Sequence, residues 1–412
     1  MKQTILLFAV WLLAIPVFSQ GKAEQEKIVI GKTDSVQSKI LGEQRKIWVH
    51  VPDRPDNSKD RYPVVYVLDG DGHFSSLVGM IQQLSSGGNN NCPKMIVVAV
   101  HNTDRTRDLT PTHIDADPPF MDSSASKTSG GGEHFIAFME KELMPYIESN
   151  YPTAPFKIFI GHSFGGLAVM QTFTHHTHLF DAYISIDPSM WWDQQKLLKQ
   201  TEKALAEKKY EGKSFYLGVA NTMEEGMELK KVQDDTSAAT RHIRSILAMQ
   251  AAFEKNSQNG LRYRGKYYPD DTHGSVPLIT EYDALRFLFD FFPTKFGMKD
   301  YTDSTGALAA RYRNHFANLS KQMGYSIKPD EMEINYMGYD FLGRKLYRTA
   351  EALFKLNMEN YPEHYNVYDS YGDYLVAIGD KANAVLQYKK ALAIEENEGS
   401  RKKLKDLEEE KK

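Results

Sequence analysis

A serine flanked by glycines stands where an apolar segment of the chain ends. Residues 158–160 are apolar, and Gly161-His162-Ser163-Phe164-Gly165 follows them, which fits the pattern G-x-S-x-G. In that pattern a strand turns sharply into a helix, the glycines permit close backbone approach, and the serine hydroxyl lies exposed beside the helix N-terminus. A helix-like segment follows the motif, so we predict that Ser163 is a nucleophile. The alternative is a tight turn that holds an incidental serine.

A serine nucleophile needs a general base, and the chain has 13 histidines. In proteins with this motif the order along the chain is serine, acid, histidine. His273 lies in a loop between an apparent last strand at 263–268 and a helix at 280–291, so we predict that it is the base. His242 lies within a predicted helix at 236–252 and is expected to be a surface residue.

The sequence leaves the acid of a triad open. The acid would orient the imidazole and stabilise its cation. We select Asp235, whose alternative role is to cap the helix that follows it. Any of several other carboxylates could take the role, and a Ser–His dyad without an acid is a further alternative. These candidates are Asp234, Glu225, Glu228, Glu224 and Asp187.

Acyl transfer also requires two backbone amides that hold the oxyanion. One amide is expected from Phe164, directly after the serine. The other is expected from the loop 68–74, where Gly70 and Asp71 are equal candidates. Glycines in this loop allow the backbone to approach a substrate closely.

The elements that must position these residues alternate between strands and helices from about residue 28 to residue 292. Short apolar segments typical of buried parallel strands occur at 62–68, 95–100, 157–160, 182–186 and 214–219, with an alternating strand at 46–51. This order predicts an α/β sandwich with a mostly parallel sheet. The segment 115–132 is rich in Asp, Pro, Ser and Gly, and is predicted to be a lid or binding loop.

The C-terminal third of the chain has a different character. It lacks strand-like segments and repeats with an offset of about 34 residues, the period of tetratricopeptide repeats. Gly338 and Gly372 are equivalent in the two copies, as are Phe354 and Tyr388. We predict a helical connector at 295–330 and an all-α unit at 331–412, made of two repeats and a capping helix. Such a unit is a candidate surface for a protein partner.

The N-terminus and the composition restrict location and partners. Residues 1–19 have the form of a secretory signal peptide, with an apolar segment at 5–18 and cleavage after Ser19. We expect a secreted, periplasmic protein with no membrane span after cleavage. The net charge of −4 does not indicate nucleic acid. Cys92 is the single cysteine and cannot form an internal disulfide. The cluster His175, His176 and His178 is interpreted as a solvated helix end instead of a metal site.

Several motifs together resemble the esterase branch of the α/β-hydrolases. They are LDGDGHF, VVAVHNTDRTRDLTP, GHSFGG, SIDPSMWWD and HGSVPL, within about residues 28–292. That branch includes siderophore trilactone esterases, feruloyl and acetyl-xylan esterases, S-formylglutathione hydrolases and mycolyl transferases, and the likeness is greatest to the enterochelin-esterase-like group. The resemblance implies an esterase domain at 20–294, with Ser163 as nucleophile and His273 as base.

The resemblance also places Trp191 and Trp192 near the substrate pocket, where paired indoles could form a flat apolar wall. The alternative is that they pack between helices. Arg105 and Arg107 could hold an anionic substrate group, although Asp104 and Asp108 beside them favour internal ion pairs. Arg107 is retained as a candidate substrate-binding residue.

These expectations combine into an exported serine esterase that acts on a small-molecule ester through an acyl-enzyme. The reaction requires no metal or organic cofactor. An acyltransferase on the same site is the first alternative. A binding protein that works through the repeats, with the hydrolase domain as scaffold, is the second.

Overall fold

The computed structural model of the chain describes residues 27–54, 59–87 and 89–409. The predicted signal peptide at 1–19 lies outside these residues. Within the described ranges, no helix has both the length and the apolar character needed to cross a membrane.

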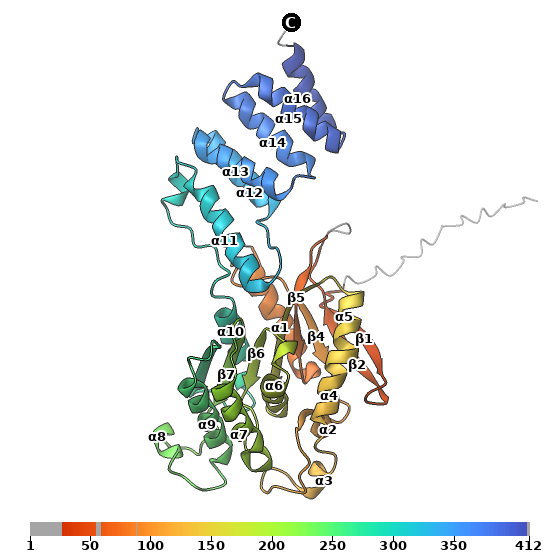
Figure 1. Cartoon of the computed structure of the whole chain (residues 1–412), viewed down its shortest axis with the longest axis vertical. Coiled ribbons are helices and arrows are strands. Elements are labelled where there is room, and N and C mark those ends of the chain that lie inside the picture. The colour runs from red at the N-terminus through yellow and green to blue at the C-terminus, as the bar shows by residue number, and fades with distance from the viewer. Residues whose placement is uncertain (1–26, 55–58, 88, 410–412) are drawn as a thin grey trace, which may run out of the picture.

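Eight strands form a single sheet in the order β1-β2-β4-β3-β5-β6-β7-β8 (Figure 1). The first two join the sheet through antiparallel pairing, and β4, β3, β5, β6, β7 and β8 are parallel to one another. Seven strands match predicted segments, whereas the polar edge strand β1 was not predicted. The strands are β1 Lys32–Ser38, β2 Glu43–His50, β3 Tyr62–Val67, β4 Ile96–Val100, β5 Thr153–His162, β6 Ala182–Ile186, β7 Ser214–Ala220 and β8 Arg262–Tyr268.

Helices cover both faces of the sheet and create two hydrophobic cores. Neighbouring residues of β3 enter different cores, with Val64 on one face and Val65 on the other, as expected for a strand buried on both sides. One face carries α1 (Gly70–Ser85) and α10 (Val276–Leu288). The other carries α6 (Phe164–His175), α7 (Trp192–Glu207), α9 (Arg241–Lys255) and the segment formed by α4 (Gly132–Phe138), η1 (Met139–Leu143) and α5 (Met144–Asn150).

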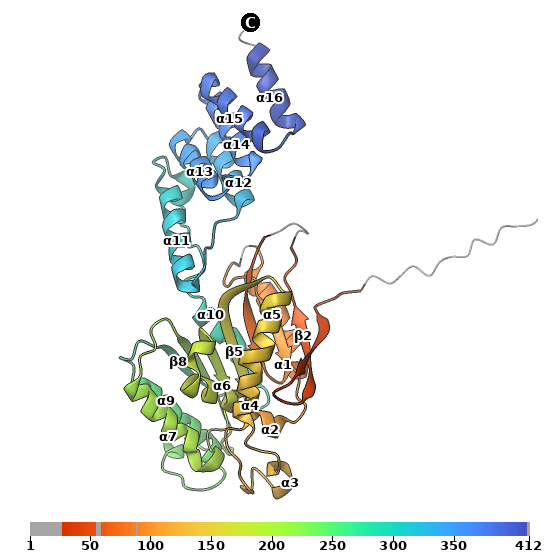
Figure 2. The same ribbon diagram turned by 45° about the vertical axis from the view of Figure 1, so that its right-hand side comes forward.

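Short helices lie in the connections between these elements. They are α2 (Arg105–Leu109), α3 (Ser123–Ser126), η2 (Thr177–Leu179), α8 (Leu229–Val232) and η3 (Asp300–Thr302). Two of them, α2 and α3, lie beyond the carboxyl ends of the parallel strands (Figure 2). This is the edge of an α/β sheet where binding sites form.

The chain after the sheet is helical and extends away from the sandwich in both views (Figure 1 and Figure 2). It comprises α11 (Ala307–Met323), α12 (Glu331–Gly343), α13 (Tyr347–Asn360), α14 (Tyr365–Ala377), α15 (Lys381–Ile394) and α16 (Glu398–Glu409). Gly338 packs on the Phe354 ring, and Gly372 packs on the Tyr388 ring in the same way. The predicted fold class, a mostly parallel α/β sandwich followed by an all-α unit, is confirmed.

Candidate active site

Ser163 occupies a sharp turn between β5 and α6. Its backbone has φ 60° and ψ −114°, a strained conformation for a residue with a side chain. A Cβ atom on Gly161 would lie 2.3 Å from the Gly165 carbonyl oxygen, so only glycine fits at that position. The structure therefore contains the strained strand-to-helix turn that the G-x-S-x-G pattern predicts.

The Ser163 hydroxyl has one hydrogen-bond partner among the described residues, Ser189 Oγ at 3.5 Å. It makes no hydrogen bond to His273, although both side chains line the same pocket. In enzymes without bound substrate, such catalytic contacts are often long and shorten in the complex.

His273 pairs with Asp187, which directly follows β6. The distance from His273 Nδ1 to Asp187 Oδ2 is 2.6 Å, and the Asp187 side chain is fully buried. The Ala220 amide donates to Asp187 Oδ1 at 2.9 Å. Because β5 and β6 are adjacent and parallel, their carboxyl ends bring Ser163 and Asp187 to one edge of the sheet.

Hydrogen bonds keep the Asp187 carboxyl ionised. Burial alone would raise its pKa, but the hydrogen bonds from His242 and His273 outweigh burial and hold the pKa well below its usual range. An ionised carboxylate only accepts hydrogen bonds, so Nδ1 of His273 must carry a proton. Nε2 of His273 is then free to accept a proton.

The structure does not bring Asp235 to His273. The Asp235 carboxylate accepts hydrogen bonds from the Ser237 amide at 2.9 Å and from the Thr240 hydroxyl at 2.7 Å. Short polar side chains commonly satisfy nearby backbone groups in this way. The choice of Asp235 as partner of the base is therefore corrected to Asp187. The signal that sequence reasoning undervalued was the position of Asp187 directly after a strand adjacent to the serine strand.

His242 is buried, contrary to the expectation of a surface residue. Its Nε2 lies 2.8 Å from Asp187 Oδ2, the same oxygen that accepts from His273. The His242 and His273 rings meet edge to face, with centroids 5.2 Å apart. One carboxylate oxygen thus binds two imidazoles, a feature that the helical pattern around His242 did not reveal.

A third imidazole packs against His273. The His162 ring lies 4.4 Å from the His273 ring, centroid to centroid, and its buried Nε2 has no hydrogen-bond partner among the described residues. Burial, together with the nearby His273, lowers the pKa of His162 to about 4. His162 is therefore neutral at neutral pH and adds no positive charge next to His273.

The pocket above these residues has a volume of about 330 Å³ and aromatic walls. Trp191 stacks on Phe120, with ring centroids 4.9 Å apart. Both tryptophans are buried, but Trp192 lies outside the lining of this pocket, and its indole N–H donates to the Thr112 carbonyl at 3.1 Å. Of the two tryptophans predicted near the substrate, only Trp191 lines this pocket. Its lining residues are Phe120, Ser163, Phe164, Ser189, Trp191, Thr222, Ala239, His242 and His273.

The segment predicted as a lid or binding loop contributes one wall of the pocket through Phe120. A salt bridge of 2.7 Å joins Asp117 of this loop to Arg241 of α9. The Arg241 guanidinium also lies over the Phe120 ring at 4.7 Å. These contacts join the loop to α9 at the rim of the pocket.

The expected oxyanion amides belong to the first turns of two helices. Phe164 begins α6 and Gly70 begins α1. First-turn amides have no acceptor within their own helix. A Cβ atom on Gly70 would lie 2.9 Å from the Ala99 backbone, so close packing requires glycine there. Gly70 and Asp71 share this turn and remain equal candidates.

Arg107 lies outside the pocket and is engaged in ion pairs. Its guanidinium contacts Glu43 at 2.7 Å and Asp108 at 2.7 Å. The structure therefore does not place Arg107 where it would contact a substrate bound in this pocket. Arg105 is also ion-paired, but to Asp69 and not to the neighbouring Asp104 or Asp108, whereas Arg107 does pair with Asp108.

The histidine cluster at the end of α6 forms no common site. His175 contacts Gln200, His176 contacts Glu133, and His178 contacts Glu140. In the described part of the chain, the only three metal-ligand side chains that converge are Asp187, His242 and His273. The His242 and His273 nitrogens in this group already hydrogen-bond to Asp187 Oδ2.

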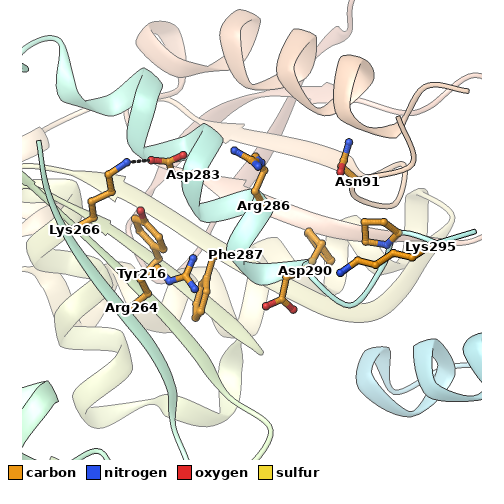
Figure 3. A pocket seen from close by; sticks show the side chains of 11 residues that line it. Asn91, Tyr216, Arg264, Lys266, Asp283, Arg286, Phe287, Asp290 and Lys295 are labelled. Carbon is orange, nitrogen blue, oxygen red and sulfur yellow. Dashed lines mark hydrogen bonds and ion pairs between the residues drawn. The ribbon is translucent and has the colours of Figure 1, made fainter. Parts of the chain in front are cut away.

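A second pocket, of about 410 Å³, lies beside α10 and β8 (Figure 3). Charged side chains of both signs surround it, and Lys266 pairs with Asp283 across part of its wall. It contains none of the predicted site residues. The aromatic pocket is therefore the candidate active site, because it gathers Ser163 and His273.

Comparisons with known proteins agree with this geometry. The family model described as Putative esterase matches residues 38–263. The ferri-bacillibactin esterase BesA of Bacillus subtilis (strain 168) is 28% identical over 236 residues, which cover 55% of this chain and 78% of that protein.

Two solved structures extend the comparison. The crystal structure of an IroE-like serine hydrolase from Shewanella oneidensis is 30% identical, covers 80% of this chain and 99% of its own, and has a TM-score of 0.67. An uncharacterised protein from Capnocytophaga ochracea is 19% identical, with coverage of 92% and 99% and a TM-score of 0.61. At that identity the second match shows the fold alone. Because it covers 92% of this chain, the match includes part of the C-terminal helices.

Proposed function

The chain belongs to the Putative esterase family and is a carboxylic ester hydrolase, and from that premise we propose that Ser163, His273 and Asp187 form its catalytic triad. The observation that carries this proposal is the bond of 2.6 Å between His273 Nδ1 and buried Asp187. Ser163, on its strained turn, lines the same pocket as His273.

In the proposed reaction Ser163 Oγ attacks the ester carbonyl carbon while His273 Nε2 takes the hydroxyl proton. Asp187 holds the imidazole in the required tautomer and stabilises the imidazolium. The amides of Phe164 and of Gly70 or Asp71 bind the oxyanion.

The same groups then complete the turnover. His273 returns the proton to the leaving alkoxide, and Ser163 keeps the acyl group. A water molecule attacks the acyl carbon as His273 takes its proton, and His273 then gives that proton to Ser163 Oγ as the acyl–Oγ bond breaks, which releases the acid and free Ser163.

We propose a siderophore ester as the first substrate class to examine. The support is the name of the ferri-bacillibactin esterase that the chain resembles, together with the aromatic wall formed by Phe120 and Trp191. Stacked rings of this kind offer a flat apolar surface to a planar substrate group.

We also propose that α12–α16 are two tetratricopeptide-like repeats with a capping helix, which bind a protein partner. Support comes from Gly338 on Phe354 and Gly372 on Tyr388, two equivalent contacts one repeat apart. Export to the periplasm is a further proposal, and it rests on the apolar segment 5–18.

The test of the triad compares two serines that share the pocket. Hydrolysis of p-nitrophenyl esters, methyl ferulate and a siderophore ester is measured for wild type, Ser163→Ala and Ser189→Ala, with folding checked by circular dichroism. We expect Ser163→Ala to lose at least about 10³-fold in kcat. Ser189→Ala should stay within about tenfold of wild type, because its hydroxyl forms no covalent bond in the proposed reaction.

Two results would count against the proposal. Equal activity in wild type and Ser163→Ala would remove Ser163 from the mechanism. Abolition by Ser189→Ala alone would make Ser189 the nucleophile.

A further inference from the structure

The first turn of α1 is held by side-chain contacts at Asp69, before the amides expected to bind the oxyanion, and at His73, after them. Before the amides in the chain, Asp69 is bound by Arg105 in a bidentate manner, with Nε to Oδ1 at 2.7 Å and Nη2 to Oδ2 at 2.9 Å. Asn102 donates to the same carboxylate at 2.6 Å. Asp69 directly precedes Gly70, so the ion pair holds the residue that leads into the first amide of the helix.

The same arginine also contacts the nucleophile turn. Its Nη2 donates to the His162 carbonyl at 3.2 Å, and its guanidinium lies 5.3 Å from the centre of the Phe164 ring. His162 precedes Ser163 and Phe164 follows it. Arg105 therefore touches the loop that carries one proposed oxyanion amide and the turn that carries the other.

Both parts that Arg105 joins have strained backbones. Asp69 has φ 52° and Ser163 has φ 60°, values that cost free energy and persist only where surrounding contacts enforce them. The two parts are also in close contact, because a Cβ atom on Gly165 would lie 3.3 Å from the Asp69 carboxylate. A charged, bidentate contact is a suitable restraint, since such hydrogen bonds are directional and strong.

After the amides in the chain, at the end of the same helix turn, His73 binds a buried carboxylate of α10. His73 Nδ1 lies 2.7 Å from Glu281 Oε1, and the Glu281 side chain is 1% exposed. Helix α10 begins at Val276, three residues after His273. This pair links the turn of α1 to the helix that follows the proposed base.

We propose that Arg105 is a positioning residue that holds the two oxyanion amides in register, with the His73–Glu281 pair as the opposing anchor. The inference rests on the proposed function, because it assigns a role within that same site. Arg105 acts through Asp69 and the nucleophile turn, and not by direct contact with substrate. Its loss should weaken binding of the tetrahedral intermediate more than binding of the substrate.

The chain offers a matched control in Arg107. Arg107 lies in the same short helix, α2, and its guanidinium also binds a carboxylate in a bidentate manner, with contacts to Glu43 at 3.2 Å and 2.7 Å. It contacts none of the proposed oxyanion residues. Arg105→Gln and Arg107→Gln therefore each remove a bidentate arginine–carboxylate pair, and the second also removes the contact with Asp108. Only the first should disturb the oxyanion site.

The experiment measures both variants in the full chain with three assays. These are kcat and KM for p-nitrophenyl butyrate, the affinity of an arylboronic acid that forms a tetrahedral adduct, and the rate of Ser163 phosphonylation by a fluorophosphonate. For Arg105→Gln we expect kcat to fall about 10–100-fold with KM within about threefold. Boronate affinity and phosphonylation rate should fall by similar factors, and Arg107→Gln should keep all values within about threefold.

Two further variants guard against a failure of Arg105→Gln to fold. Arg105→Lys keeps the charge but loses the bidentate contact, so its kcat should also fall while KM holds. Glu281→Gln weakens the opposing anchor at similar volume, because an amide oxygen replaces the carboxylate, and should lower kcat about 3–10-fold with KM unchanged.

The outcomes separate this inference from the proposed function. An inactive wild type that a fluorophosphonate does not label at Ser163 overturns the proposed function, and the inference with it. An active wild type with equal effects in Arg105→Gln and Arg107→Gln overturns the inference alone. A rise in KM without loss of kcat or boronate affinity also overturns it, because Arg105 would then bind substrate.

Discussion

Replacing Asp187 by asparagine tests the assignment of the triad acid, because the side chain keeps its shape and loses its charge. The asparagine oxygen can still accept from the Ala220 amide, as Asp187 Oδ1 does. Its NH₂ group would then face the two imidazole N–H groups of His273 and His242 that now donate to Oδ2. His273 would take the other tautomer, with the proton on Nε2, and could no longer accept a proton from Ser163.

The size of the effect follows from the geometry of the pair. At an effective dielectric of about 20, two unit charges 2.6 Å apart interact by about 6 kcal/mol. Solvent reduces this value because the His273 side chain is 41% exposed, and His242 shares the same oxygen. We therefore expect a loss of about 3–5 kcal/mol of transition-state stabilisation, or roughly 10²–10⁴-fold in kcat.

The assay is steady-state hydrolysis of a p-nitrophenyl ester, with Asp235→Asn as the control. Among the described residues, the Asp235 carboxylate accepts hydrogen bonds from Ser237 and Thr240 alone, so its substitution should leave kcat within about threefold. Thermal unfolding of both variants separates a loss of catalysis from a loss of fold. The reasoning fails if Asp187→Asn stays active. A loss of roughly 10²–10⁴-fold in Asp235→Asn instead would identify Asp235 as the acid.

The remaining predictions concern stability. The pKa of His162 is about 4 in the folded protein because of burial, against about 6.5 when unfolded. The unfolded chain therefore takes up a proton before the folded protein does as the pH falls. The contribution of neutral His162 to the free energy of unfolding is full above about pH 6.5 and is lost as the pH falls toward 4. The melting temperature of His162→Gln should therefore fall less than that of wild type between about pH 7 and pH 4.5; an equal or steeper fall would contradict the buried, neutral state. In the helical unit, a Cβ atom on Gly372 would lie 2.5 Å from the Tyr388 ring, whereas one on Gly343 would have no neighbour within 4 Å. We expect Gly372→Ala to lower the free energy of unfolding by about 1–3 kcal/mol and Gly343→Ala to be neutral or stabilising, as measured by thermal unfolding of the full chain, and equal effects would refute the close packing.

Patterns of residues close together in the sequence predict much of the candidate site. The glycines around Ser163 and the apolar strand before it predict the strained turn, because such backbone geometry depends on residues close together in sequence. The same holds for the position of His273 after the last strand. The alternation of apolar strands with helices likewise predicted the sheet and its covering layers, since burial on both faces leaves a continuous apolar segment.

Contacts between distant segments were not readable in this way. Asp187 meets His273 across 86 positions of the chain, and loop length alone allowed several carboxylates to compete. His242 has the pattern of an ordinary helix residue, yet the packing of α9 places it on the same carboxylate. Arg107 matched a motif, but its orientation toward Glu43 removes it from the pocket.

The sequence by itself thus determined the fold class, the strained turn at Ser163 and the candidate base, because each depends on periodicity or on a backbone conformation that few residues permit. Only the tertiary structure decided which carboxylate reaches His273 and which tryptophan lines the pocket. It also decided that Arg105, and not Arg107, contacts both Asp69 and the backbone of the serine turn. Those choices depend on the order of parallel strands and on side-chain direction, which place residues from separate loops at one edge of the sheet.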